Sequence, residues 1–151
     1  MHPEAVIFIG IQATGKSTFY ASRFQRTHVR INLDMLRTRR REAILLQACL
    51  DANQSFVIDN TNPTRADRAR YLIPARERGF RTIGCYFRSS VSDAIRRNSG
   101  RQGDECVPEL AIRGTSAKLE RPALTEGFDE LLYITQTDSG TFSILPWSNE
   151  I

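Results

Sequence analysis

Short apolar runs alternate along this chain with longer stretches in which apolar residues recur at helical spacing. Runs of the first kind, bounded by glycine or polar residues, are typical of buried strands, and helical spacing is typical of amphipathic helices. Within the helix expected at 65–78, Pro74 predicts a kink or a break, and Gly79 provides a usual end. The pattern predicts strands at 5–9, 29–32, 55–59, 81–87 and 131–135, an edge strand at 141–145, and helices at 16–25, 35–52, 65–78, 91–98 and 107–119.

Strands that alternate with helices in this way build a parallel sheet with helices on both faces, so we expect a three-layer α/β fold. A chain of 151 residues has room for one such core, and we expect a single domain over 1–151. Ligands of these folds bind at the carboxyl ends of the strands. That edge would collect Gly10, Asn32, Asp59 and the segment after Phe87.

The segment 10–18, GIQATGKST, lies between the first predicted strand and the first predicted helix. It matches the pattern GxxxxGK[ST] in the strand-to-helix context that the pattern requires, which predicts a P-loop, although a glycine-rich turn that fits by chance is the alternative. Backbone N–H groups of such a loop bind phosphate at a helix N-terminus, while Lys16 would reach the β- and γ-phosphates and Ser17 would bind Mg²⁺. We therefore expect ATP and Mg²⁺ as cofactors, with the nucleotide bound by Gly10, Gln12, Ala13, Thr14, Gly15, Lys16, Ser17 and Thr18.

Charge and cysteine content narrow the class of protein further. The net charge is +4, and Lys16 and Lys118 are the only lysines among 21 basic residues. Arginine suits bidentate contact with phosphate and stacking on bases, but a GC-rich genome that favours arginine codons explains the excess equally well. No apolar run approaches the length of a membrane span, and the first strand begins too early to leave room for a signal peptide. Cys49 and Cys85 lie in apolar stretches, as expected of buried residues in a cytoplasmic protein.

Two carboxylates follow predicted strands and offer the chemistry that phosphoryl transfer needs. Asp34 lies where an acceptor hydroxyl would approach, but it also lies where the N-cap of the next helix is expected. The third residue after it is Arg37 rather than Glu or Gln, so no capping box supports the cap. Asp59 follows an apolar strand as a Walker B carboxylate does and would bind Mg²⁺, or it would open a turn at Asn60.

Arg97 and Arg101 lie one helical turn apart at the end of the helix predicted at 91–98. They are either cations that stabilise a helix C-terminus or part of a lid that closes over bound nucleotide and excludes water. Such a lid would span about 97–117, and its polar segment 100–106, GRQGDEC, is expected to be mobile.

Several segments together resemble the kinase domain of 5′-hydroxyl polynucleotide kinases. FVIDNTNPTRADRARYLIPARERG and RPALTEGFDELL resemble the kinase half of the animal polynucleotide kinase/phosphatase, and VRINLDMLR and RRNSGRQGDECVPELAIR resemble the phage enzyme. The resemblance runs from about Val6 to Ile134. Many families share the phosphate loop, whereas INxDxxR, DNTNP and RNSxR in this order are far more specific.

The resemblance implies a role for individual residues. Asp34 would be the general base on the 5′-hydroxyl, and Arg37 would contact the phosphate on the 3′ side of the acceptor nucleotide. Arg101 would bind the donor phosphates as the lid arginine and act with Lys16, while Arg97 would support the lid or the adenine side. The acceptor site would be lined by Asn60, Thr61 and Asn62, which would also help to fix Arg37.

Two departures from the family pattern concern the acceptor segment and the lid. Met35 replaces the second Asp of the phage pattern, and the connection between Arg101 and Val107 is shorter than in the animal enzyme. The residues do not distinguish a DNA acceptor from an RNA acceptor, and they indicate no role for the tail 136–151.

The predicted function is ATP-dependent transfer of the γ-phosphate to a nucleic-acid 5′-hydroxyl, with any phosphatase or ligase partner acting in trans. A kinase for a small hydroxyl compound such as a sugar acid, nucleoside or antibiotic is the alternative. A non-catalytic nucleotide switch is the third class, in which a base-like Asp34 would have no purpose. An arginine cluster favours an anionic polymer, unless it is only a solvated helix face, and comprises Arg37, Arg39, Arg40 and Arg41.

Overall fold

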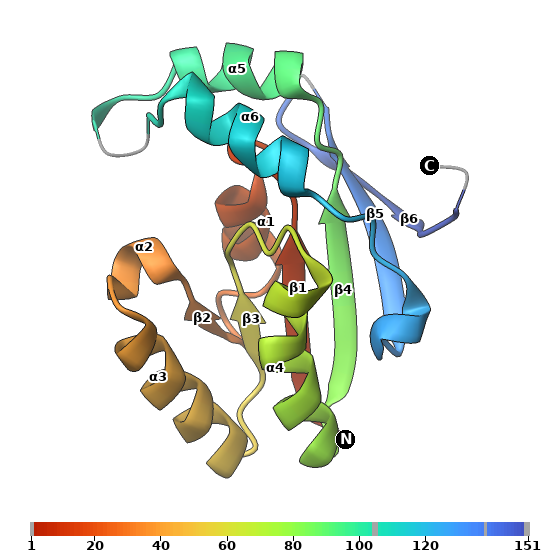
Figure 1. Cartoon of the computed structure of the whole chain (residues 1–151). Helices are drawn as coiled ribbons and strands as arrows, with labels where there is room; N and C mark the ends of the chain where they lie inside the picture. The colour runs from red at the N-terminus through yellow and green to blue at the C-terminus, as the bar shows by residue number, and fades with distance from the viewer. Residues whose placement is uncertain (1, 104–105, 138, 150–151) are drawn as a thin grey trace.

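A six-stranded sheet forms the centre of the computed structural model, which describes residues 2–103, 106–137 and 139–149 (Figure 1). The strand order is β2-β3-β1-β4-β5-β6; the first five are parallel, and β6 pairs antiparallel with β5. The predicted parallel sheet and its edge strand are therefore confirmed. The strands are β1 Glu4–Ile9, β2 Val29–Ile31, β3 Phe56–Ile58, β4 Arg81–Phe87, β5 Glu130–Gln136 and β6 Phe142–Pro146.

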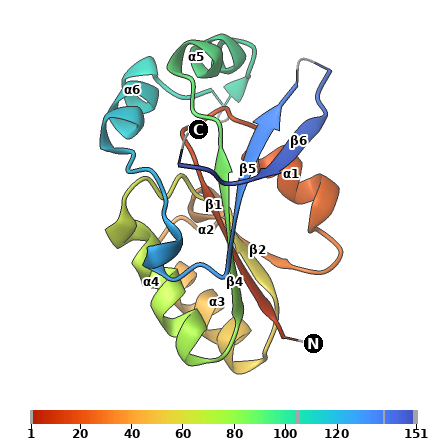
Figure 2. The ribbon, with the colours of Figure 1, turned by 90° about the vertical axis from the view of Figure 1, so that its right-hand side faces the viewer.

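Helices cover both faces of the sheet and its carboxyl end. α3 and α4 lie on one face and α1 on the other, while α5 and α6 cross above the carboxyl ends of the strands (Figures 1 and 2). This arrangement confirms the predicted three-layer fold, and α5 and α6 include most of the segment predicted as a lid. The helices are α1 Lys16–Arg23, α2 Leu33–Leu36, α3 Arg39–Asp51, α4 Arg65–Glu77, α5 Val91–Ser99 and α6 Glu109–Lys118, with a short 3₁₀ helix, η2 Leu124–Glu126.

The central strand β1 explains why the first apolar run is continuous. Ile7 and Ile9 belong to the core under α3 and α4, whereas Val6 and Phe8 belong to the core under α1. A strand in the middle of a parallel sheet is buried on both faces, so all its side chains can be apolar. The run opens directly into the phosphate loop, which therefore starts from a fully buried segment of β1.

The prediction of one continuous helix over 35–52 is wrong. The chain forms α2 and α3 instead, because Arg37 takes a positive φ of 75° and the Thr38 side chain accepts a hydrogen bond from Arg41 N, at 3.1 Å. A new N-cap at Thr38 starts a new helix axis. Pro74 does not break α4, which continues through it to Glu77.

The lid helices pack directly onto the phosphate loop. Ile11 and Ala13 of the loop share a buried cluster with Ala94 of α5 and Ile112 of α6. The Asn98 side chain donates to the carbonyl of Val107 and accepts from its N–H, at 2.6 and 2.9 Å, which joins the two ends of the connection between the helices. The predicted mobile segment 100–106 includes residues 104–105, which lie outside the described residues.

Cys49 and Cys85 are buried, as their apolar surroundings predicted, and Cys106 is exposed. Within the described part of the chain, no helix has the length and apolar character needed to cross a membrane.

Candidate active site

The phosphate loop connects β1 to α1 at the carboxyl edge of the sheet. A Cβ at Gly10 would lie 3.0 Å from the Cβ of Phe87, and one at Gly15 would lie 2.8 Å from Oε1 of Gln136. Gly15 also has a positive φ of 94°, so both positions require glycine. The Gly10 N–H donates to the carbonyl of Thr61 at 3.0 Å, which ties the loop to the segment after β3.

Lys16 lies inside the loop that precedes it. Its ammonium group donates to the carbonyls of Gly10 and Ile11, at 3.0 and 2.6 Å. Burial lowers the pKa of Lys16 from 10.5 to about 8; the Asp59 carboxylate opposes this shift, the Arg101 guanidinium adds to it, and Asp34 opposes it. The structure thus brings Lys16, Asp34, Asp59 and Arg101 within electrostatic range of one another.

Ser17 and Asp59 form the oxygen pair expected of a metal site. Ser17 Oγ donates to Asp59 Oδ2 at 3.0 Å, and the Asp59 side chain is 2% exposed. A hydroxyl and a carboxylate at this spacing fit Mg²⁺, which prefers a few protein oxygens together with substrate phosphates. The described residues contain no cluster of three or more His, Cys, Asp or Glu side chains that would suit another type of metal site.

Arg30 of β2 contacts the same two oxygens. Its Nε donates to Asp59 Oδ2 at 2.8 Å, and its Nη2 donates to Ser17 Oγ at 3.0 Å. The sequence interpretation missed this residue, although a charged side chain in a short apolar strand was a visible signal.

Two asparagines fix the turn that carries Asp34. Asn32 caps α2 by accepting from Met35 N at 2.9 Å, and its amide donates to the carbonyl of Asp59 at 2.6 Å. Asn60 Oδ1 accepts from Leu33 N at 2.8 Å. Asn32, and not Asp34, is therefore the helix cap, and Asp34 stands exposed in the first turn of α2 at the carboxyl edge of the sheet.

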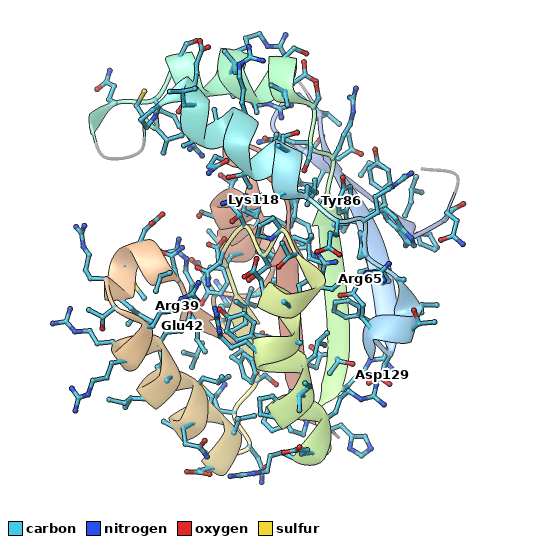
Figure 3. The ribbon with its side chains drawn as sticks, viewed as in Figure 1. Arg39, Glu42, Arg65, Tyr86, Lys118 and Asp129 are labelled. Atoms are coloured by element: carbon cyan, nitrogen blue, oxygen red, sulfur yellow. The ribbon has the colours of Figure 1, made fainter. Side chains whose placement is uncertain are left out.

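Asn60 is also hydrogen-bonded to a polar cluster formed by Glu42, Arg39 and Tyr71. Glu42 is 2% exposed; its carboxylate accepts from Asn60 Nδ2 at 3.1 Å and from Arg39 Nη1 at 2.8 Å. The Tyr71 hydroxyl accepts from the same Arg39 nitrogen at 3.1 Å, and burial raises the pKa of Tyr71. Figure 3 shows Arg39 and Glu42 together at the start of α3, on its side toward the sheet. The Arg39 side chain is thus bound to Glu42 and Tyr71, but it stays 53% exposed, beside the other arginines of the predicted cluster.

Thr61 and Asn62 lie closer to the phosphate loop than to the acceptor side. Asn62 is 4% exposed, and its amide donates to the carbonyl of Phe8 at 2.8 Å. Its φ is positive, at 44°. Together with the bond from Gly10 to Thr61, this contact makes the 60–62 segment a support for the phosphate loop.

The lid contributes Arg97, Arg101 and Thr115. Arg97 Nη2 donates to the carbonyl of Gln136 at 3.4 Å, which places it toward the end of β5. Gln12 Nε2 donates to Thr115 Oγ1 at 3.0 Å, so the phosphate loop is hydrogen-bonded to α6. Arg101 acts on Lys16 from the segment that follows α5. A loop, a buried lysine, an oxygen pair, an exposed carboxylate and lid arginines are the parts that phosphoryl transfer uses.

The sheet order, the phosphate loop after β1 and the carboxylate at the end of the neighbouring β3 define a P-loop domain of the kinase type. The chain belongs to the AAA domain family, AAA_33, whose model matches residues 6–122.

A curated relative supports the resemblance seen in the sequence motifs. The chain is 30% identical over 132 residues to the bifunctional polynucleotide phosphatase/kinase of Schizosaccharomyces pombe. The match covers 84% of this chain and 32% of the relative, so the chain spans about a third of that protein's length. The predicted similarity to polynucleotide kinases is thereby confirmed.

Solved structures of kinases share the fold. A fungal RNA kinase superposes with a TM-score of 0.69 at 14% identity, over 89% of this chain and 38% of that one. A gluconokinase from Sinorhizobium meliloti 1021 gives 0.63 at 17% identity, over 87% of this chain and 82% of that one. The chain therefore has the fold of these kinases, in agreement with the predicted fold class.

Proposed function

We propose that this protein transfers the γ-phosphate of ATP to the 5′-hydroxyl of a nucleic acid. The observation that carries the proposal is the exposed Asp34, fixed by amides of Asn32 and Asn60 from two neighbouring strand ends and close enough to act on the charge of Lys16. The 30% identity with a polynucleotide phosphatase/kinase supports a polynucleotide as the acceptor class.

Each residue has a chemical task in this proposal. The phosphate loop and Lys16 hold the β- and γ-phosphates, and Asp34 accepts the proton of the attacking hydroxyl. The Lys16 and Arg101 charges stabilise the negative charge on the transferring phosphoryl group. Arg37 binds the phosphate on the 3′ side of the acceptor nucleotide, and Arg97 supports the lid near the end of β5.

Ser17 and Asp59 would hold Mg²⁺, directly or through water. When bound, the metal would neutralise part of the negative charge of the phosphates. Asn62 and Thr61 act through the phosphate loop by holding the carbonyl of Phe8 and the N–H of Gly10. The lid helices, packed on Ile11 and Ala13, would exclude water from the reacting groups.

A small-molecule kinase is the second candidate, because the fold is shared with a gluconokinase over most of both chains. An enclosed acceptor pocket would favour a small-molecule kinase. A polynucleotide kinase is favoured by exposed arginines, and Arg37, Arg40 and Arg41 are exposed on and beside the connection between α2 and α3, where an anionic polymer could pass.

An acceptor competition tests the proposal. Purified protein receives γ-labelled ATP, Mg²⁺ and equal concentrations of a 5′-hydroxyl oligonucleotide, as DNA or RNA, a nucleoside and a sugar acid; Lys16→Ala is the control. We expect label on the oligonucleotide, and none with the control. Label on a small compound instead would overturn the polynucleotide assignment and support the second candidate.

A further inference from the structure

Arg30 of β2 contacts Ser17 and Asp59, the two residues of the proposed donor metal site. It lies on β2 between the apolar residues Val29 and Ile31, and its guanidinium donates to the two oxygens assigned to the metal. The Arg30 side chain is 29% exposed, and that of Asp59 is 2% exposed. The guanidinium is thus the solvent-side cover of a buried carboxylate.

Neighbouring side chains hold the guanidinium of Arg30 in place. Its guanidinium lies 6.0 Å from the centre of the Tyr20 ring, and the Tyr20 hydroxyl donates to the carbonyl of His28 at 2.7 Å. An aromatic ring at this distance attracts a cation. Asp59, Ser17 and Tyr20 therefore hold the guanidinium from three sides.

Arg30 and a metal ion would compete for the hydroxyl oxygen of Ser17. The Ser17 hydroxyl hydrogen is directed to Asp59, and its oxygen accepts from Arg30 Nη2 at 3.0 Å. A metal bound to that oxygen would place a second cation against the guanidinium, with Asp59 between them. Like charges this close repel each other.

We propose that Arg30 competes with Mg²⁺ for Ser17 and Asp59. In the absence of metal its charge neutralises the buried Asp59. When Mg²⁺ binds with the nucleotide, Arg30 releases Ser17 and moves its guanidinium toward solvent. Arg30 therefore raises the Mg²⁺ concentration at which the donor site assembles. The inference rests on the magnesium nucleotide site of the proposed function and is independent of the acceptor.

The test measures binding rather than transfer. A fluorescent ATP analogue is titrated with Mg²⁺ in the presence of wild-type protein, Arg30→Gln or Arg26→Gln, without acceptor. Arg26 is an exposed arginine on the connection between α1 and β2 and serves as the matched control. The half-saturating Mg²⁺ concentration should fall by about 5- to 150-fold in Arg30→Gln, the usual range for coupled binding sites. It should not change in Arg26→Gln.

A second readout covers the metal-free protein. In EDTA, Arg30→Gln should have a lower melting temperature than wild type, because Asp59 loses its cation, and added Mg²⁺ should raise it more than in wild type. Arg30→Lys, which keeps the charge but lacks the two-nitrogen fork of the guanidinium, should need an intermediate Mg²⁺ concentration.

An unchanged or higher Mg²⁺ requirement in folded Arg30→Gln would overturn the inference and leave the proposed function standing. Nucleotide binding by wild type that does not depend on Mg²⁺ would overturn both the inference and the metal role of Ser17 and Asp59. Failure of the acceptor assay alone would leave the competition between Arg30 and Mg²⁺ intact.

Discussion

At the scale of single residues, short polar side chains at strand ends determine where the chemistry can occur. Asn32 caps α2 and also binds the Asp59 carbonyl, so one amide links the turn that carries Asp34 to the strand end that carries Asp59. Neither contact has a sequence signature beyond a capping residue. The motif INxDxxR predicted that Asp34 matters, but the structure shows that Asn32 makes its position possible.

The lowered pKa of Lys16 predicts a pH dependence of nucleotide binding. Lys16 has a pKa of about 8 because it is buried, so in the free protein it loses its proton above that pH. Phosphates bind the charged form more tightly, which raises the pKa in the complex. ATP affinity should therefore be constant below pH 8 and fall by up to about tenfold per pH unit above it.

Titration of ATP binding between about pH 6.5 and 9.5 checks this expectation, where Lys16 titrates in the free protein. Lys16→Ala is the control and should bind weakly, without that dependence. A wild-type affinity that stays constant to pH 9.5 would show that Lys16 is not the titrating group.

At the scale of elements, the sequence pattern predicted the strands well and the segment between β2 and β3 poorly. Buried strands of a parallel sheet are continuous apolar runs bounded by polar residues, a local signal that needs no knowledge of neighbours. The apolar positions of α3 continue in phase past Thr38, so periodicity alone did not reveal that Thr38 starts a second helix. Arg37, with its positive φ, marks the break.

The positive φ of Arg37 predicts that two substitutions there differ in protein stability but not in acceptor binding. A φ of 75° is unfavourable for a residue with a Cβ, and glycine relieves it. Arg37→Gly should therefore be more stable than Arg37→Ala by about 1 kcal/mol. Both variants should bind a 3′-phosphorylated acceptor more weakly than wild type, and by the same factor.

Chemical denaturation of the two variants, together with acceptor KM values for a nucleoside 3′-phosphate and a bare nucleoside, provides the comparison. Equal losses with both acceptors would remove Arg37 from phosphate recognition. Equal stabilities of the glycine and alanine variants would show that the turn is not strained.

At the scale of the whole molecule, contacts between distant segments hold the site, and these were invisible in the sequence. Arg68 of α4 is fully buried and forms two bonds to Glu126 of η2, at 2.8 and 3.1 Å. Its remaining nitrogen donates to the carbonyls of Asn62 and Pro63, at 3.0 and 3.2 Å. Arg68 and Glu126 are 58 positions apart, so no local sequence pattern could have paired them. This ion pair anchors the segment that supports the phosphate loop.

Loss of one partner of this ion pair should be severe. Glu126→Ala leaves the Arg68 charge buried without its counter-ion, and we expect the free energy of unfolding to fall by about 3–5 kcal/mol. The double variant Arg68→Met/Glu126→Leu removes both charges and should recover part of that loss. Urea denaturation measures both.

The exposed pair Arg78–Asp51, at 2.6 Å, is the matched control. Asp51→Ala should cause little or no change, because water screens exposed ion pairs. A Glu126→Ala variant as stable as Asp51→Ala would contradict the anchoring role of Arg68.

The central claim, that Asp34 takes the proton from a nucleic-acid 5′-hydroxyl, is tested most directly by single-turnover transfer. Excess protein loaded with γ-labelled ATP and Mg²⁺ is mixed with a 5′-hydroxyl oligonucleotide, for wild type and Asp34→Ala, and label at the 5′ end is followed over time. We predict that Asp34→Ala binds ATP as wild type does and transfers phosphate slower by about 10²-fold or more. Transfer by Asp34→Ala at the wild-type rate, or no labelled 5′ end with wild type that has ATP bound, would contradict the account.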